Sequence, residues 1–386
     1  MGAFALVADA VFDGENLRRH GAVVVEGEHV VAVARHEDVA TERTLRLPSG
    51  TILAPGFIDV QVNGGGGILL NDSPTVEGIA TIASTHRRFG TTGLLPTLIS
   101  DSREAMRRAI EAVAESLEKG VPGVLGIHLE GPFLNADRKG VHPPEHILAM
   151  EAGDIELVSA LGSRGITLVT LAPEVVPAGC IAELTRRGVI VCAGHTQATA
   201  AQVLAAIDEG LTGVTHLYNA MSQLGSREPG AVGATLATRD VYAGIIPDGR
   251  HVADLSLKLS WIAKGTDRLM IVTDAMPPVG TALREFSLFG RTIQVREGRC
   301  TTADGTLAGA NVDMASAVRY MARQVGVGLE AALAMASRTP AEFLGMASNR
   351  GRLVPGAAAD IVALDPDLRV LETWIAGRSP GSKGSS

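Results

Sequence analysis

Seven polar residues each end a short apolar run in this sequence, and their types suit metal-assisted hydrolysis. Two are histidines, which offer ring nitrogens, and three are acids, which offer carboxylate oxygens. Histidine and carboxylate together suit a borderline divalent cation such as zinc. A catalytic zinc commonly keeps three protein ligands and leaves one position for water. The seven residues are Gln61, Asn63, Glu130, His195, His216, Asp248 and Asp274.

Each of these residues also has a purely structural interpretation. A lone histidine such as His195 could simply form hydrogen bonds at the end of a strand. Glu130 could cap a loop or pair with an arginine, and Asp274 could cap a helix. These structural interpretations all become less convincing if the residues end separate strands of one barrel. The secondary structure around the residues therefore decides between a structural and a catalytic role.

Eight apolar runs alternate with helical segments between residues 56 and 274. In the segment 100–120, for example, apolar residues recur with helical spacing, Ser100 or Ser102 can cap the helix, and Gly120 can end it. Alternating buried strands and helices indicate parallel β/α units, and eight such units fit a TIM barrel. The runs are 56–61, 92–97, 124–130, 167–172, 189–195, 213–216, 242–248 and 269–274.

An open doubly wound sheet would explain the same alternation. That fold predicts a G-x-G-x-x-G motif that opens the first helix, and the glycines at 64–67 lack this register. The barrel is therefore favoured. Active sites of TIM barrels lie at the C-terminal ends of the strands, which is where the seven polar residues stand.

Both ends of the chain look like short strands separated by turns, at 4–8, 21–25 and 359–365. We therefore predict an α/β protein: a (β/α)8 TIM barrel with a small β-sandwich domain formed by both chain ends. Residues 1–54 and 350–386 would form the β domain, and residues 55–349 the barrel. We expect a hairpin insertion within 280–309, followed by helices at 311–324 and 329–344.

The composition favours a cytoplasmic enzyme that acts on a small molecule. The net charge of −8 without a long basic run argues against nucleic acid or an anionic membrane as the main partner. An aromatic content of 3% argues against a base-stacking surface. The three cysteines show no CxxC spacing, and no secretory signal or long apolar span is evident.

Several motifs resemble a known family. Residues 55–64 are similar to the first barrel strand of the amidohydrolase superfamily, and 356–362 to its C-terminal β-domain strand. The motifs at 128–133 (HLEGPF), 193–196 (AGHT), 215–221 (THLYNAM) and 272–275 (VTDA) resemble the N-acetylglucosamine-6-phosphate deacetylase family in particular. The resemblance spans about residues 50 to 365, with the motifs in the expected order.

The resemblance implies hydrolysis of N-acetylglucosamine 6-phosphate to glucosamine 6-phosphate and acetate, in amino-sugar catabolism and cell-wall sugar recycling. It makes Glu130, His195 and His216 the ligands of one divalent metal per subunit, zinc first, with iron, cobalt or manganese as alternatives. Asp274 would take a proton from the metal-activated water and return it to the departing amine. His142 matches the family histidine on the carbonyl side.

One triplet departs from the wider superfamily. Many members carry His-x-His at the end of the first strand, where this chain has Gln61-Val62-Asn63. Because a neutral amide is a poor ligand, we expect the second metal site to be weak or empty. Gln61 is a candidate to contact the metal-bound water, with a hydrogen bond to loop backbone as the alternative.

The substrate phosphate needs a local cation, because the protein as a whole is anionic. We expect Arg227, Arg250 and His251 to provide it. The resemblance implies that His251 reaches the site of a neighbouring subunit in a homodimer. The full set of expected substrate contacts is Val141, Asn219, Ala220, Arg227, Asp248, Arg250, His251, Leu307, Ala308 and Gly309.

Three competing interpretations remain. N-acetylgalactosamine 6-phosphate is an alternative substrate that the sequence does not separate from its epimer. A dihydroorotase-like enzyme would carry the His-x-His pair and a metal-bridging lysine, which are not found in their usual places. A non-catalytic relative would have lost a ligand or Asp274, and this chain keeps all four residues.

Overall fold

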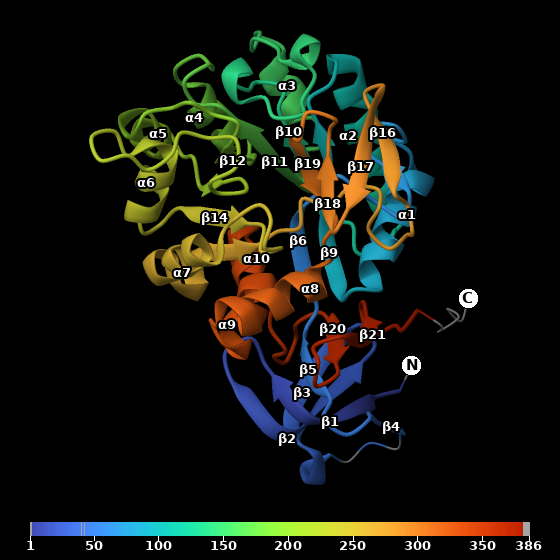
Figure 1. Ribbon diagram of the computed structural model, residues 1–386. Coiled ribbons are helices and arrows are strands. Elements are labelled where there is room, and N and C mark those ends of the chain that lie inside the picture. The colour runs from blue at the N-terminus through green and yellow to red at the C-terminus, as the bar shows by residue number, and fades with distance from the viewer. Residues whose placement is uncertain (1, 40, 42, 381–386) are drawn as a thin grey trace.

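A barrel of eight parallel strands forms the centre of the molecule. The computed structural model describes residues 2–39, 41 and 43–380, so residues 381–386 of the predicted β domain lie outside it. The strand order is β15-β14-β13-β12-β11-β10-β9-β6, which follows the chain and confirms the predicted fold (Figure 1). The strands are β6 (Phe57–Val62), β9 (Thr91–Ile99), β10 (Gly126–Glu130), β11 (Ile166–Leu171), β12 (Ile190–Ala193), β13 (Gly213–Val214), β14 (Tyr242–Ile245) and β15 (Leu269–Ile271).

Hydrogen bonds between β6 and the segment after β15 close the barrel. Val62 forms a parallel bridge with Ala275, and the backbone N–H of Asp274 donates to the carbonyl of Gln61 at 3.0 Å. The Thr273 hydroxyl donates to the buried Asp59 carboxylate at 2.5 Å. This closure brings the C-terminal ends of all eight strands around one opening.

Helices surround the barrel (Figure 1). Ser102 caps α2, because its side chain accepts a hydrogen bond from the N–H of Ala105, and the predicted apolar face of this helix is buried. Within the described ranges, no helix combines the length and hydropathy needed to cross a membrane. The helices are α1 (Val76–Arg87), α2 (Arg103–Glu118), α3 (Asp154–Val158), α4 (Cys180–Arg186), α5 (Ala200–Asp208), α6 (Gly230–Ala237), α7 (Asp254–Arg268), α8 (Met314–Arg319), α9 (Leu329–Ala336) and α10 (Arg338–Phe343), with a π-helical stretch at Tyr320–Val325.

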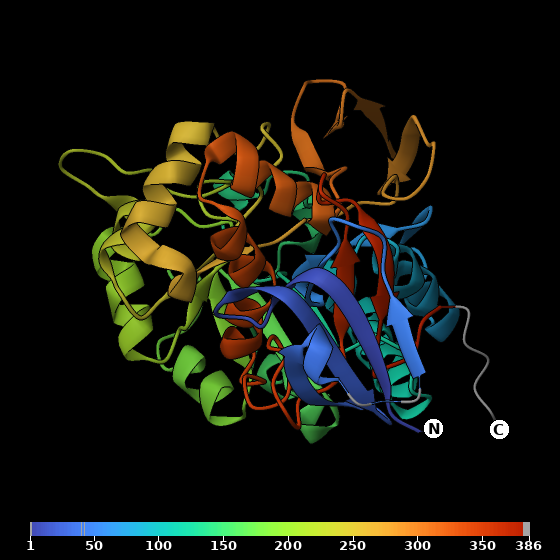
Figure 2. The same cartoon turned by 90° about the horizontal axis from the view of Figure 1, so that it is seen from below.

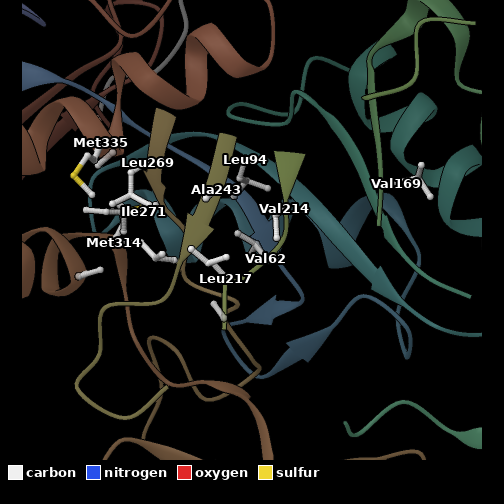
Figure 3. Packing of buried hydrophobic residues seen from close by; sticks show 14 of the residues in the cluster. Val62, Leu94, Val169, Val214, Leu217, Ala243, Leu269, Ile271, Met314 and Met335 are labelled. Carbon is white, nitrogen blue, oxygen red and sulfur yellow. The ribbon is translucent and has the colours of Figure 1, made fainter. Parts of the chain in front are cut away.

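The core of the barrel domain lies between the strands and these helices. Val62 and Leu94 come from the first two strands, while Leu269 belongs to the last. Met314 of α8 and Met335 of α9 pack into the same cluster (Figure 3). The apolar sides of strands and helices are therefore used for packing, which leaves the strand ends free for polar residues.

The two chain ends meet in a second sheet, as predicted. It contains β1 (Phe4–Phe12), β2 (Leu17–Glu26), β3 (His29–Arg35), β4 (Arg43–Arg46), β5 (Ile52–Pro55), β20 (Ile361–Leu364) and β21 (Val370–Trp374). Strand β5 pairs with both β1 and β20, so the expected sandwich is one continuous hydrogen-bonded sheet. A bridge between His29 and Ala358 joins β3 to the segment before β20, and the sheet curls around a core of its own (Figure 2).

The insertion after the eighth strand is larger than predicted. The expected hairpin is β16 (Glu285–Leu288) paired with β17 (Arg291–Arg296), but β18 (Arg299–Thr301) and β19 (Leu307–Ala310) extend it to four antiparallel strands. These two added strands are too short to show a clear alternation of apolar residues. Ala310 then bridges Ala275, which brings the insertion to the mouth of the barrel.

We expect Gly126→Ala to destabilise the barrel. A methyl group on Gly126, the first residue of β10, would lie 1.9 Å from the carbonyl oxygen of Ile166 on β11. Overpacking of this kind costs roughly 1–3 kcal/mol. A lower melting temperature in a thermal unfolding scan would show it. Gly153→Ala is the matched control, because nothing lies within 4 Å of the added carbon, and an equal loss in both variants would contradict the explanation.

Candidate active site

Three residues at the ends of β10, β12 and β13 bring their ligand atoms together at the barrel mouth. Glu130 is the last residue of β10, while His195 and His216 follow β12 and β13. Their ligand atoms all lie within 4.8 Å of one another, and all three residues are buried. Glu130 Oε1 lies 2.9 Å from His216 Nε2 and 3.3 Å from His195 Nε2. A buried carboxylate and two imidazole nitrogens aimed at one point are a donor set that fits one divalent cation.

Hydrogen bonds around the ligands favour the form that binds metal. His195 Nδ1 donates to the backbone carbonyl of Arg138 at 2.8 Å, which leaves the Nε2 lone pair directed at Glu130 and His216. Burial alone would raise the pKa of Glu130, but its close contacts with the ring nitrogens of His195 and His216 hold it well below its usual range. The carboxylate is therefore charged, as a ligand must be.

The backbone adopts a left-handed conformation at three residues of the barrel mouth. His195, His216 and Asp274 have positive φ angles of 48°, 32° and 50°. A residue other than glycine in this region costs on the order of 1–3 kcal/mol and is typical of functional sites. Each turn comes just after a barrel strand, and the three side chains all line the same cavity.

Asp274 is held by two amide side chains. Asn63 Nδ2 donates to Asp274 Oδ1 at 2.6 Å, and Gln61 Nε2 donates to the same oxygen at 3.2 Å. Burial and the charge of Glu130 raise the pKa of Asp274 to about 6. Within the described chain, Oδ2 of Asp274 has no hydrogen bond from the protein, so this oxygen is the one free for proton transfer.

Gln61 links the two carboxylates of the site. Its Nε2 also donates to Glu130 Oε1 at 3.0 Å, so the amide does not bond loop backbone, which was one of its two predicted roles. Its Oε1 is buried and has no partner among the described residues, so this acceptor is available to a water. The amide donors of Gln61 and Asn63 thus each face a carboxylate of the site.

His142 presents a hydrogen-bond donor beside the metal ligands. Its Nδ1 accepts a hydrogen bond from the N–H of Ser100 at 3.2 Å, and the rings of His142 and His195 are 4.4 Å apart. Burial and the neighbouring His195 lower the pKa of His142 to about 3, so the ring is neutral. With Nδ1 acting as acceptor, the proton of the neutral ring is on Nε2.

A cavity of about 490 Å³ contains the three candidate metal ligands, Asp274 and His142, and this volume is within the usual size of small-ligand sites. Of the predicted substrate contacts, Val141, Asn219, Ala220, His251, Leu307 and Gly309 line this cavity.

Four predicted contacts lie elsewhere. Arg227 is in the exposed segment 223–229, Arg250 lines a separate cavity, and Ala308 is fully buried in β19. Asp248 stands behind His251, whose Nδ1 donates to it at 2.7 Å.

The structure places His251 at the cavity of its own chain. Its hydrogen bond to Asp248, three residues earlier in the same loop, holds it there. The expected reach of His251 to the site of a neighbouring subunit stays a prediction.

Several cavity residues had no role in the sequence analysis. Asn63 was seen as a strand-end residue, but its contact with Asp274 requires the closure between first and last strands. Arg138 and Thr306 also line the cavity. The position of Arg138, four residues before His142, was the available signal.

We expect Asn63→Ala to reduce kcat by roughly 10- to 100-fold, as for other residues that orient a reacting group. The substitution removes the shortest hydrogen bond to Asp274 and leaves the three metal ligands in place. Steady-state kinetics with metal analysis tests this. Unchanged kcat with full metal content would contradict the role of Asn63.

Comparison with known proteins places this fold and site in a class. A model of the amidohydrolase family matches residues 52–379. The chain belongs to the amidohydrolase family, as its strand motifs predicted. It is 46% identical to the N-acetylgalactosamine-6-phosphate deacetylase of Shewanella sp. (strain ANA-3), over 97% of this chain and 95% of that protein. It is 35% identical to the N-acetylglucosamine-6-phosphate deacetylase of Haemophilus influenzae, over 97% of this chain and 98% of that protein.

Solved structures of proteins named as deacetylases have the same fold as this chain. The N-acetylglucosamine-6-phosphate deacetylase from Pasteurella multocida superposes with a TM-score of 0.95 at 35% identity, covering 98% of this chain and 100% of that chain. The enzyme of the same name from Mycobacterium smegmatis gives a TM-score of 0.91 at 34% identity, covering 98% and 100%. The resemblance inferred from the motifs is therefore confirmed.

Proposed function

We propose that this enzyme hydrolyses the acetamide of N-acetyl-D-glucosamine 6-phosphate to D-glucosamine 6-phosphate and acetate. The observation that carries the proposal is the convergence of Glu130, His195 and His216 with Asp274 and His142 in one cavity. The relatives named for this reaction on amino-sugar phosphates support it, since they match nearly the whole chain. A role in amino-sugar catabolism and cell-wall sugar recycling belongs to the same proposal.

Glu130, His195 and His216 would hold one divalent metal per subunit. Two nitrogens and one carboxylate oxygen suit zinc first, with iron, cobalt or manganese as alternatives. When bound, such an ion lowers the pKa of water from 15.7 toward neutrality and polarises a carbonyl oxygen. The remaining steps fall to the side chains of this chain.

Asp274 carries the proton. Its free Oδ2 accepts a proton from the water as the new C–O bond forms at the acetamide carbon, while Asn63 and Gln61 hold Oδ1. The protonated Asp274 then donates to the sugar nitrogen, the C–N bond breaks, and the amine leaves. One residue can perform both transfers because burial raises the pKa of Asp274 above the ordinary carboxyl value, which makes its carboxylate a stronger base toward the water.

His142 stabilises the negative charge that develops on the carbonyl oxygen. Its Nε2–H lies beside the metal ligands, and the neutral ring keeps this proton near pH 7. A fixed donor aimed at a developing oxyanion is among the larger contributions to catalysis.

The proposal is tested by assaying acetate release from N-acetylglucosamine 6-phosphate with the metal-loaded enzyme. We expect multiple turnovers at neutral pH. If metal-loaded, folded enzyme releases no acetate from this substrate or its galactose epimer, the proposed function is wrong.

N-acetylgalactosamine 6-phosphate is a second candidate substrate. It is favoured by the 46% identity to the Shewanella enzyme, against 35% for the Haemophilus enzyme named for the other epimer. Comparing kcat/KM for the two substrates in one preparation decides between them. A higher kcat/KM for N-acetylgalactosamine 6-phosphate would overturn the choice of N-acetylglucosamine 6-phosphate as the substrate.

We further propose that the enzyme is a homodimer that forms over α7. Leu255, Leu259 and Ile262 repeat with helical spacing on this helix and are 79%, 61% and 66% exposed. Arg227 and Arg250 lie outside the cavity of their own chain, on the loops before α6 and α7, and these two helices pack together. A second copy that packs on α7 would cover these apolar residues. The loops that carry Arg227 and Arg250 in one copy would then lie close to the cavity of the other copy.

Light scattering on the eluting protein tests the dimer. We expect Leu259→Lys to shift the protein to the mass of a single chain, since a charge on this face opposes its burial. Leu45→Lys, on the exposed strand β4, is the matched control and should leave the mass unchanged. A single-chain mass for the unsubstituted protein would contradict the proposal.

A further inference from the structure

Glu174 lies on the loop that follows β11, and β11 stands between the two strands whose ends carry Glu130 and His195. Its half-buried side chain does not line the cavity, and no step of the proposed mechanism uses it. Among the described residues, no arginine, lysine or histidine forms an ion pair with its carboxylate. The partners that Glu174 does have are hydrogen-bond donors, and they indicate its role.

Both oxygens of the Glu174 carboxylate accept hydrogen bonds from neighbouring loops. Oε1 accepts from Asn135 Nδ2 at 2.9 Å and from the backbone N–H of Gln197 at 2.6 Å. Oε2 accepts from the hydroxyl of Thr196, a fully buried residue, at 2.5 Å. Hydrogen bonds to an ionised acceptor are roughly twice as strong as neutral ones. One carboxylate thus joins the loop after β10 to the loop after β12.

The two loops that Glu174 joins meet again at His195. The backbone N–H of Asn135 donates to the carbonyl of His195 at 2.9 Å, and His195 Nδ1 donates to the carbonyl of Arg138 at 2.8 Å. His142 lies on the same loop as Arg138, and its ring is 4.4 Å from the ring of His195. A shift of either loop would therefore move a metal ligand relative to the proposed oxyanion donor.

Thr196 extends these contacts to the loop that follows the third ligand. Its backbone N–H donates to the carbonyl of Ala220 at 3.1 Å, and its own carbonyl accepts from the N–H of Ser222 at 3.0 Å. Ala220 lines the cavity four residues after His216. The hydroxyl that Glu174 holds thus belongs to a residue bonded to the loops of both histidine ligands.

We propose that Glu174 is a positioning residue, which clamps the loop of His195 to the loop of His142 and thereby sets the affinity of the site for its metal. It acts through its neighbours, because it does not line the cavity itself. Without the carboxylate, two N–H groups and one hydroxyl around the site lose their acceptor. The inference rests on the proposed function, since it concerns the metal site of that reaction.

The experiment measures the zinc dissociation constant of the metal-free protein by competition with a chelating dye, which requires no turnover. It compares Glu174→Ala and Glu174→Gln with Glu209→Ala. Glu209 is the matched control, because its carboxylate accepts the N–H of Gly179 on the same loop at 3.1 Å and has no bond to the loops of the site. Melting temperatures of the metal-free variants and kcat at saturating zinc complete the comparison.

We expect Glu174→Ala to weaken zinc binding by roughly 10- to 100-fold, as for other residues that orient metal ligands. At saturating zinc its kcat should also fall, by a larger factor than KM changes. Glu174→Gln keeps the shape and the Oε1 acceptor, so it should fold and should lose roughly fivefold, the difference between a charged and a neutral acceptor. Glu209→Ala should bind zinc as the unsubstituted protein does.

Unchanged zinc affinity in the Glu174 variants would overturn the inference, even if their melting temperature fell, because a merely structural role affects stability alone. An equal loss of zinc affinity in Glu209→Ala would also overturn it. Failure of the proposed function looks different. In that case the unsubstituted, zinc-loaded enzyme releases no acetate from either sugar phosphate, and the zinc dissociation constants still report on Glu174.

Discussion

Asp274→Asn should reduce kcat by at least roughly 10³-fold, because a positioned acid or base contributes 10²–10⁴-fold and this residue performs both proton transfers. The substitution changes little else. Asparagine has nearly the same shape, and its carbonyl can still accept the hydrogen bonds from Asn63 and Gln61 that now hold Oδ1. It cannot, however, take a proton from water at neutral pH.

Metal analysis separates the loss of a base from the loss of a ligand. Asp274 is not among the three residues whose ligand atoms converge, so the variant should retain about one equivalent of metal. Asp240→Asn is the matched control, since this acid is 90% exposed at the opposite end of the barrel, just before β14. Near-normal turnover of Asp274→Asn would remove Asp274 from the mechanism.

The barrel could be predicted because its strands are buried on both faces. Runs such as Leu269–Ile271 and Ile190–Ala193 are apolar throughout, and each is followed by a polar residue at the mouth. The extent of the insertion could not be predicted in the same way. Its added strands β18 and β19 are three and four residues long and are stabilised by partners far away in the sequence.

The candidate metal site could be placed at the barrel mouth for the same reason as the barrel. Residues that end parallel strands of one barrel face the same opening, so their type and position indicated a site for a cation, and the resemblance to the deacetylase family implied which three residues are its ligands. The residues that contact substrate were harder to predict from the sequence, because they lie on loops. Arg227 carries a charge suited to phosphate, yet its loop points into solvent, while Arg138 reaches the cavity because its carbonyl is tied to His195.

Gln61 and Asn63 are residues whose importance the sequence indicated, although it did not reveal their hydrogen-bond partners. The loss of the His-x-His pair indicated a weak second metal site. The structure adds that the replacing amides donate to Glu130 and Asp274, which lets two acids remain close without a second cation. That pairing depends on contacts between the first, third and last strands and has no signature along the chain.

Removal of the metal should abolish turnover, with a loss of at least roughly 10³-fold, because water with a pKa of 15.7 then supplies almost no hydroxide near pH 7. We expect a chelator to produce this loss and about one equivalent of zinc per chain to reverse it, since the described residues offer one set of three converging ligands. Iron, cobalt and manganese added separately would rank the alternatives.

The same zinc titration applied to Glu130→Gln distinguishes a catalytic metal from one that is not required for activity. The neutral amide removes the charged ligand that both histidines face at 2.9 and 3.3 Å, so this variant should bind zinc weakly and should not recover activity at one equivalent. Full activity after complete metal removal would refute metal-assisted hydrolysis. Recovery of activity that requires two equivalents of zinc would instead show that one ion at the three converging ligands is insufficient for turnover. In that case the amides of Gln61 and Asn63 do not prevent a second cation from binding.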